Sequence, residues 1–199
     1  MKKLNLFKVE EDFRKLGLKI FTSKDLMVSF GVEKRAAEAF LSYNVKKGAV
    51  VRLKAGLFAF AKNLPGDFTV ANRLYFPSYI SLETACAFYN LIPEAVYSIT
   101  SVTTKPTREF LALGKSFAYK RIKKEAYTGY VLTQAMGEKF YLANPEKAVA
   151  DLLWFVYLRK ATWNERLKTT RLDLKKLEEY LRLFSPKLIS FAQKIIKNA

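Results

Sequence analysis

The segment Thr22–Lys47, TSKDLMVSFGVEKRAAEAFLSYNVKK, has the pattern of two helices joined by a tight turn. Thr22 or Ser23 can cap a short first helix, because a side-chain oxygen there accepts from a free backbone N–H. Gly31 interrupts the pattern where a turn needs a permissive backbone. The second helix is expected from about Glu33 to Lys46. Two helices around a short glycine turn, the second one basic, are typical of a helix-turn-helix.

The second helix is amphipathic, with apolar residues at steps of three and four. Its expected inward face consists of Ala36, Ala37, Phe40, Leu41 and Val45. Its expected outward face consists of Lys34, Arg35, Glu38, Ser42 and Lys46. The charged face is therefore predicted to point into solvent.

The flanking elements complete a winged-helix pattern over residues 1–63. A helix precedes the segment, with one apolar face made by Leu6, Val9, Phe13 and Leu16. Two short strands follow, at residues 50–54 and 57–60, around Ala55 and Gly56. Arg52 and Lys54 alternate with apolar residues, so both cations are expected on one face of the hairpin. A basic hairpin after the second helix is the wing.

The basic residues of this part of the chain are the candidate DNA contacts. Residues 1–63 carry 14 basic and 6 acidic side chains, a net of +8. The predicted DNA-binding residues are Lys24, Lys34, Arg35, Lys46, Lys47, Arg52 and Lys54. Lys34 and Arg35 would reach base edges or phosphates, and Arg52 and Lys54 would hold the backbone. Two alternatives remain, a small helical domain with solvated charges and a winged helix that binds protein.

Composition narrows the function classes. The net charge is +17 in 199 residues, which favours a polyanionic partner. Nucleic acid comes first and an anionic membrane surface second, beside the alternative that the charge only keeps the protein soluble. There is no histidine, which removes His-dependent catalysis and His metal sites. The single cysteine, Cys86, cannot form an internal disulfide, fits a reducing cytoplasm and is expected in the core.

Residues 64–199 are predicted to form a second, mixed α/β domain that ends in a helical hairpin, which makes the whole chain α+β. Strands are expected at residues 97–104 and 117–122, and a strand hairpin around Gly137. Ser81 and Asn144 are placed to cap helices, and Pro145 suits the first position of the second one. Two C-terminal helices are expected, starting at Asp173 and after Ser185.

Three runs in the middle of the chain resemble the AbiEi family. They are NRLYFPSYISLETA at residues 72–85, LIPEAVYSITSVTTKPTREF at 91–110 and YLANPEKAVADLL at 141–153. Their order and spacing also match, and the resemblance covers about residues 1–160. It implies an antitoxin of the type IV toxin-antitoxin class that represses its own operon by binding inverted repeats with the winged helix. It further implies a nucleotidyltransferase-like partner toxin that is countered without a required stable complex.

No catalytic residue, metal site or cofactor is predicted. Glu83, Glu94, Glu146 and Asp151 could suggest a carboxylate site, but each has a local explanation as a first-turn helix acid or a solvated charge. The leading hypothesis is thus a cytoplasmic, non-enzymatic repressor and antitoxin. Inverted repeats would need two protomers on the DNA, and a solution monomer could still bind them cooperatively. The alternatives are an interaction module with a basic surface, and a nucleic-acid-processing enzyme with a winged-helix targeting domain.

Overall fold

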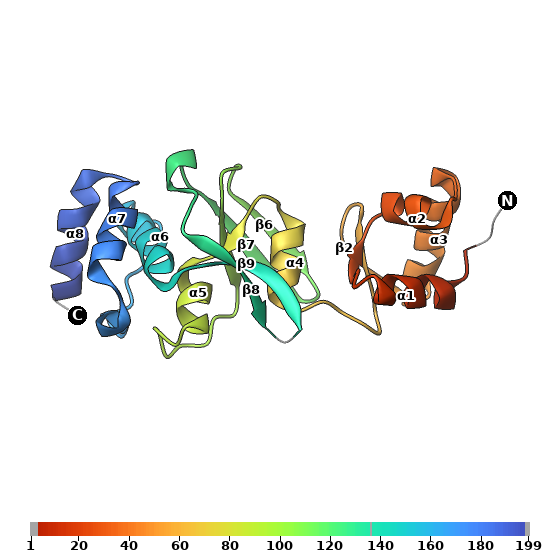
Figure 1. Cartoon of the computed structure of the whole chain (residues 1–199), viewed down its shortest axis with the longest axis horizontal. Helices are drawn as coiled ribbons and strands as arrows, with labels where there is room; N and C mark the ends of the chain where they lie inside the picture. The colour runs from red at the N-terminus through yellow and green to blue at the C-terminus, as the bar shows by residue number, and fades with distance from the viewer. Residues whose placement is uncertain (1–3, 136, 198–199) are drawn as a thin grey trace. The chain divides into compact units, whose positions relative to one another are not determined.

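The computed structural model describes residues 4–135 and 137–197. Among these residues it contains eight α-helices and two β-sheets, so the α+β class is confirmed (Figure 1). The chain divides into two compact units, Met1–Leu74 and Tyr75–Ala199. Within the described ranges, every helix is too short or too polar to cross a lipid bilayer.

The first unit contains four helices and a three-stranded antiparallel sheet. Its elements are α1 (Leu6–Lys15), β1 (Ile20–Phe21), α2 (Ser23–Phe30), α3 (Lys34–Lys46), β2 (Val50–Lys54), β3 (Leu57–Phe60) and α4 (Asp67–Leu74). The strand order is β1-β3-β2, so β3 pairs with both neighbours. The expected helices and hairpin up to residue 60 are therefore present, whereas β1 and α4 were not predicted.

Phenylalanine rings form the centre of the first unit. Phe13 from α1, Phe21 from β1 and Phe60 from β3 are buried, with ring centroids 5.2 Å apart for Phe13 and Phe21 and 4.6 Å for Phe21 and Phe60. Ala37 and Leu41 of α3 pack into the same cluster. Because each large aromatic buries much apolar surface, this cluster fixes how α3 is rotated about its axis.

Local capping defines the start and the end of α2. The Thr22 hydroxyl accepts from the Asp25 N–H, and the Asp25 carboxylate accepts from the Thr22 N–H at 2.7 Å. This reciprocal pair is a capping box. Gly31 ends the helix with φ of 62°, a conformation that favours glycine. The turn into α3 is thus set by the residues that the sequence singled out.

The second unit is built on a six-stranded mixed sheet with strand order β6-β7-β5-β4-β9-β8. Its strands are β4 (Tyr79–Ile80), β5 (Ile99–Thr103), β6 (Arg108–Ala112), β7 (Lys115–Arg121), β8 (Tyr130–Ala135) and β9 (Glu138–Ala143). Its helices are α5 (Leu82–Phe88), α6 (Pro145–Tyr157), α7 (Leu174–Arg182) and α8 (Pro186–Lys197), with short 3₁₀ turns η1 (Lys124–Ala126) and η2 (Thr169–Arg171). The strand hairpin β8–β9 and the helical hairpin α7–α8 lie where they were expected, and β4 and β6 were not predicted.

A charged pair is fully buried where α6 meets the sheet. The Asp151 carboxylate accepts hydrogen bonds from the Lys147 ammonium, from the Ser81 hydroxyl at 2.7 Å and from the Tyr79 hydroxyl at 3.1 Å. Burial raises the pKa of Asp151 and lowers the pKa of Lys147, and the opposite charge of each partner counteracts both shifts. The Lys147 ammonium also lies over the Phe184 ring, 4.8 Å from its centroid. This ion pair therefore contacts β4, α6 and the turn between α7 and α8.

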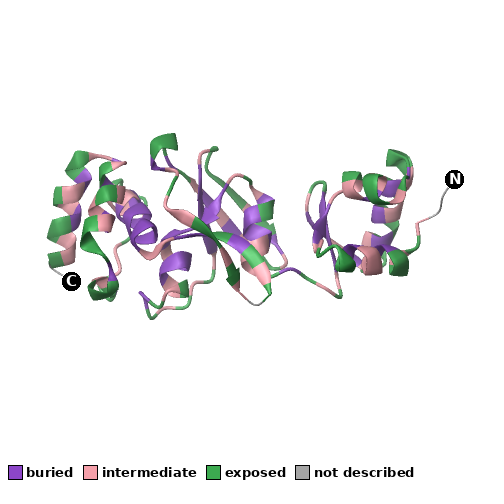
Figure 2. Cartoon of the chain, viewed as in Figure 1, coloured by how far each residue is buried: buried purple, intermediate pink, exposed green. Residues whose placement is uncertain are grey.

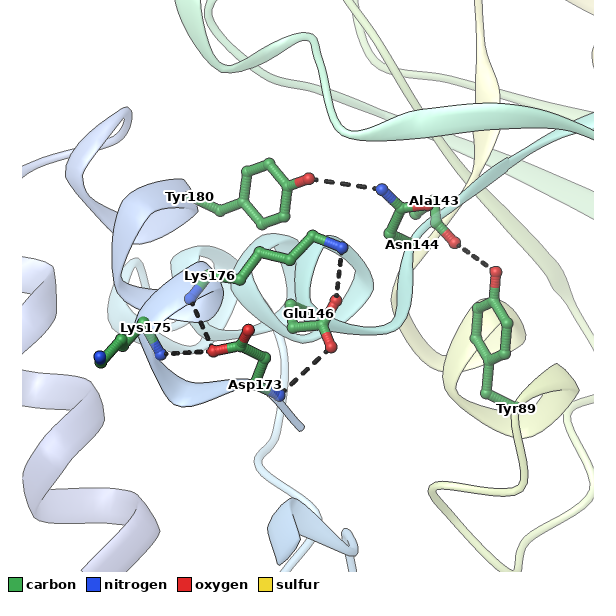
Figure 3. A network of polar contacts seen from close by, with 8 residues as sticks. All are labelled: Tyr89, Ala143, Asn144, Glu146, Asp173, Lys175, Lys176 and Tyr180. Carbon is green, nitrogen blue, oxygen red and sulfur yellow. Dashed lines mark hydrogen bonds and ion pairs between the residues drawn. The ribbon is translucent and has the colours of Figure 1, made fainter. Parts of the chain in front are cut away.

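A second polar network fixes α7 against the start of α6 (Figure 3). Glu146 accepts from the Asp173 N–H at 3.3 Å and forms an ion pair with Lys176 at 3.3 Å. Asp173 in turn caps α7 by accepting from the Lys175 and Lys176 N–H groups. The Asn144 amide donates to the Tyr180 hydroxyl at 3.4 Å instead of capping α6. Figure 2 shows the result, a largely buried α6 beside half-exposed C-terminal helices.

Removing one partner of the buried pair should destabilise the second unit strongly. Lys147→Met leaves the Asp151 carboxylate without its counter-charge, so we expect the free energy of unfolding to fall by about 3–5 kcal/mol. Both tryptophans, Trp154 and Trp163, lie in this unit, so tryptophan fluorescence during denaturant unfolding follows it alone. The double variant Lys147→Met/Asp151→Leu should recover most of the loss, and a single variant as stable as the parent would contradict the assignment.

Candidate nucleic-acid interface

The outer face of α3 carries cations at both ends and small side chains between them. With 100° per residue, Ser42 and Lys46 each fall within about 20° of Arg35 around the helix axis, and Ala39 falls within about 40° of it. All four are exposed. With 1.5 Å per residue, Arg35 and Lys46 lie about 16 Å apart along the axis. The major groove of B-DNA is about 12 Å wide, so the end cations can reach phosphates on both sides while the small residues approach the base edges.

The N-terminal end of α3 adds a second cation. Lys34 and Arg35 occupy the first turn, which contains no acidic residue. The Lys34 ammonium lies 3.8 Å from the Glu38 carboxylate, and both side chains are mostly exposed, so this ion pair is weak. Free N–H groups and two cations at a helix N-terminus both favour an anion there.

Three further predicted residues lie on the exposed surface of the first unit. Lys46 is in the last turn of α3 and Lys47 is its C-cap residue, with the Lys47 ammonium 5.8 Å from the centroid of the Tyr43 ring. Lys24 is in the first turn of α2, next to Asp25, whose carboxylate is committed to the capping box. Tyr43, 61% exposed, was not predicted as a contact, and its place in the sequence beside Ser42 was the signal that could have pointed to it.

The hairpin differs from the expectation at one point. Arg52 and Lys54 were predicted to share a face, and this prediction is wrong. Arg52 pairs with Phe58, but Lys54 pairs with Leu57, because a register shift between the two cations adds one residue to β2. A bulge of this kind reverses the alternation of side chains after it. Arg52 therefore lies on the same face as Phe58, with its guanidinium 5.6 Å from the ring centroid, and Lys54 on the other.

Lys54 is directed towards the C-terminal end of α4. The Lys54 ammonium donates to the Leu74 carbonyl at 2.5 Å, at the C-terminal end of α4. A cation is favourable there because the last carbonyls of a helix carry partial negative charge. Lys54 is half-buried, whereas Arg52 is exposed. Of the two hairpin cations, Arg52 is thus the one whose charge faces solvent.

The carboxylates considered earlier do not form a site. Asp151 was expected to be a helix-end acid or a solvated charge, and this was wrong, since it is buried in the pair with Lys147. Glu94 binds Arg166 and Asn164 instead, at 3.1 and 2.6 Å. Within residues 4–135 and 137–197, no three His, Cys, Asp or Glu side chains gather in a way that could hold a metal ion. Cys86 is buried, as expected, and burial raises the pKa of its thiol.

No protein-family model matches the chain, and no curated protein sequence matches it either. The candidate site is therefore defined from the positions of its residues in the structure alone. It is a surface of exposed cations on α2, α3 and β2, centred on the stripe from Arg35 to Lys46.

The position of Lys54 leads to a prediction that separates its role from that of Arg52. Lys54→Met keeps the aliphatic stem and removes the ammonium that binds the Leu74 carbonyl. A hydrogen bond of this kind at a partly exposed site is worth about 1 kcal/mol. We expect amide hydrogen exchange of residues 67–74 to accelerate about fivefold, measured by mass spectrometry. Arg52→Met is the matched control and should leave exchange of that segment unchanged; equal acceleration in both variants would show that Lys54 does not hold α4.

Proposed function

We propose that the chain is a DNA-binding transcriptional autorepressor whose first unit is a winged helix. The observation that carries this proposal is the outer stripe of α3, where Arg35 and Lys46 flank the small residues Ala39 and Ser42. A helix with this surface suits the major groove. The order of elements supports the proposal, because α2, the Gly31 turn and α3 are followed directly by the β2–β3 hairpin.

In this proposal each predicted residue has a distinct task. Arg35 and Lys34 contact base edges or phosphates from the N-terminal end of α3. Lys46 and Lys47 bind phosphates beyond its C-terminal end, with Lys24 as a further phosphate contact from α2. Arg52 binds the backbone from the wing. Lys54, predicted from sequence as a seventh contact, stabilises the wing through α4.

We further propose that the chain is the antitoxin of a type IV system and counters a nucleotidyltransferase-like toxin without a required stable complex. Support comes from the resemblance to the AbiEi family. Its three runs supply the buried interactions of the second unit. Tyr79 and Ser81 belong to the first run and Lys147 and Asp151 to the third, and Thr100 of the second run donates to the Ser81 carbonyl at 2.8 Å. The resemblance thus concerns residues on which the folding of that unit depends.

Charge-removing variants test the DNA contacts. Each lost phosphate contact should weaken binding to all sequences and lower the slope of log K against log salt by about one. We expect this result for Arg52→Ala. Arg35→Ala should in addition reduce discrimination between the operator and other DNA, at a cost of about 1–3 kcal/mol if a base contact is lost.

Lys15→Ala is the matched control. Lys15 is also exposed and also in the first unit, but it lies on α1 in an ion pair with Glu11 at 2.7 Å. The variant removes the same charge and should leave the salt slope within error of the parent. If Lys15→Ala changed the slope as much as Arg52→Ala did, the binding would be a general charge effect and the interface would be wrong.

Co-expression tests the antitoxin role separately. Cells arrested by a nucleotidyltransferase-like toxin encoded next to this chain should resume growth when the chain is supplied. Arg35→Ala/Arg52→Ala should still restore growth while losing repression of a reporter, because both substitutions lie on the DNA surface. Growth that stays arrested with the parent chain would contradict the antitoxin proposal and leave the repressor proposal intact.

A further inference from the structure

The edge strand β8 lies in the longest uncharged stretch of the sequence. Residues 126–137 contain no Asp, Glu, Lys or Arg, a run of twelve residues in a chain that carries 53 such side chains in 199 residues. Uncharged runs are usually buried. In the two next-longest runs, at residues 84–93 and 95–104, the helix and strand are the buried parts, since most of α5 and all of β5 are buried. In β8, by contrast, all six residues are at least partly exposed.

β8 forms one end of the six-stranded sheet and pairs only with β9. Its outer side therefore presents backbone N–H and C=O groups that pair with no other strand of the described residues. Proteins usually protect such an edge with charged side chains or proline. The opposite edge, β6, has this protection, with Arg108 and Glu109 exposed on the strand and Pro106 just before it. β8 has none.

Apolar side chains are exposed on both faces of the β8 edge. Val131 is 47% exposed on one face and Leu132 is 57% exposed on the other. Tyr141 of β9, 38% exposed, lies directly opposite Leu132. At the start of the strand, Tyr130 stacks on the buried Tyr79 with ring centroids 4.5 Å apart. The edge is thus apolar, and the stacking of Tyr130 holds its first residue in place, which lowers the entropy cost of binding another strand.

We propose that β8 pairs with β8 of a second copy of this chain, antiparallel, and joins two sheets across a two-fold axis. The charge of the chain favours a second copy over another protein as the partner of β8. Two chains of net charge +17 repel each other, and an edge strand without charge is the place where they can approach with least repulsion. A strand from another protein would need no such neutrality, because an acidic strand would bind a basic chain better.

Symmetry and the exposed leucines together define the register. A two-fold axis normal to the sheet keeps each side chain on its own face. Residues that lie directly opposite one another must therefore both have even numbers or both have odd numbers. An axis through Leu132 places Leu132 against Leu132 of the second copy, with Tyr130 opposite Gln134 and Val131 opposite Thr133. This register joins the exposed leucines, and apolar cross-strand pairs stabilise such a pairing. The proposal is independent of DNA binding, since none of these residues belongs to the first unit.

Disulfide trapping in the absence of DNA tests the proposal directly. Opposed residues in an antiparallel pair have Cα atoms about 4.5–5.5 Å apart, within the range that a disulfide spans. Leu132→Cys should therefore form a covalent dimer under mild oxidation, in about 0.15 M salt to screen the charge repulsion. Leu111→Cys on β6, where the leucine is 79% exposed, is the matched control and should stay monomeric. Equal cross-linking of both variants, or none of Leu132→Cys, would overturn the proposal.

Sedimentation equilibrium of the full chain provides the second readout. The parent should show a monomer–dimer equilibrium. Leu132→Arg should raise the dissociation constant by at least about tenfold, because it places two like charges face to face, and Leu111→Arg should not. Circular dichroism verifies that both variants are folded. Self-pairing would be overturned if the parent stayed monomeric up to about 1 mM, or if its dimer were insensitive to Leu132→Arg. The edge would then bind a strand of another protein or no partner.

Discussion

The packing of α3 onto the phenylalanine cluster is the constraint on which the proposed function depends. Ala37 and Leu41 are buried against Phe13, Phe21 and Phe60, and this contact sets the rotation of α3 about its own axis. A rotation of 100°, one residue, would bury part of the cationic stripe and expose part of the apolar one. The cations therefore face solvent because the apolar side of α3 is buried in the core, and the proposed DNA recognition depends on this packing.

Local signals in the sequence predicted the first unit well. The capping residue Thr22, the turn at Gly31 and the helical periodicity of α3 act within a few residues, so the chain itself specifies them. The same reasoning placed Ser81 and Asn144 correctly at the N-cap positions of α5 and α6, but it was wrong about what their side chains bind. Both stand before helices, but their side chains bind Asp151 and Tyr180 across the fold. Sequence spacing carries no information about such partners, because they are about 70 and 36 residues away.

Sheet edges and register were equally inaccessible from sequence. The bulge between Arg52 and Lys54 changes which face each cation occupies, and alternation alone could not indicate it. The pairing order of the second sheet places residues 130–135 at an edge, although their apolar character would suit a central strand. The amino-acid composition predicted the overall basic charge. The structure was needed to show which charges lie on the exposed surface, which stabilise helix ends and which form the buried pair.

Binding of duplex DNA from the region upstream of the gene, compared with scrambled DNA of equal length across a salt titration, is the most direct measurement. We expect a preference for the upstream duplex that persists at about 150 mM salt, with the number of lost counterions set by the cations of α2, α3 and β2. If both duplexes bound with equal affinity and both were released as the salt concentration rose, the surface would attract polyanions in general and would not recognise a DNA sequence. Absence of binding to either would contradict the assignment of α3 as a DNA-reading helix.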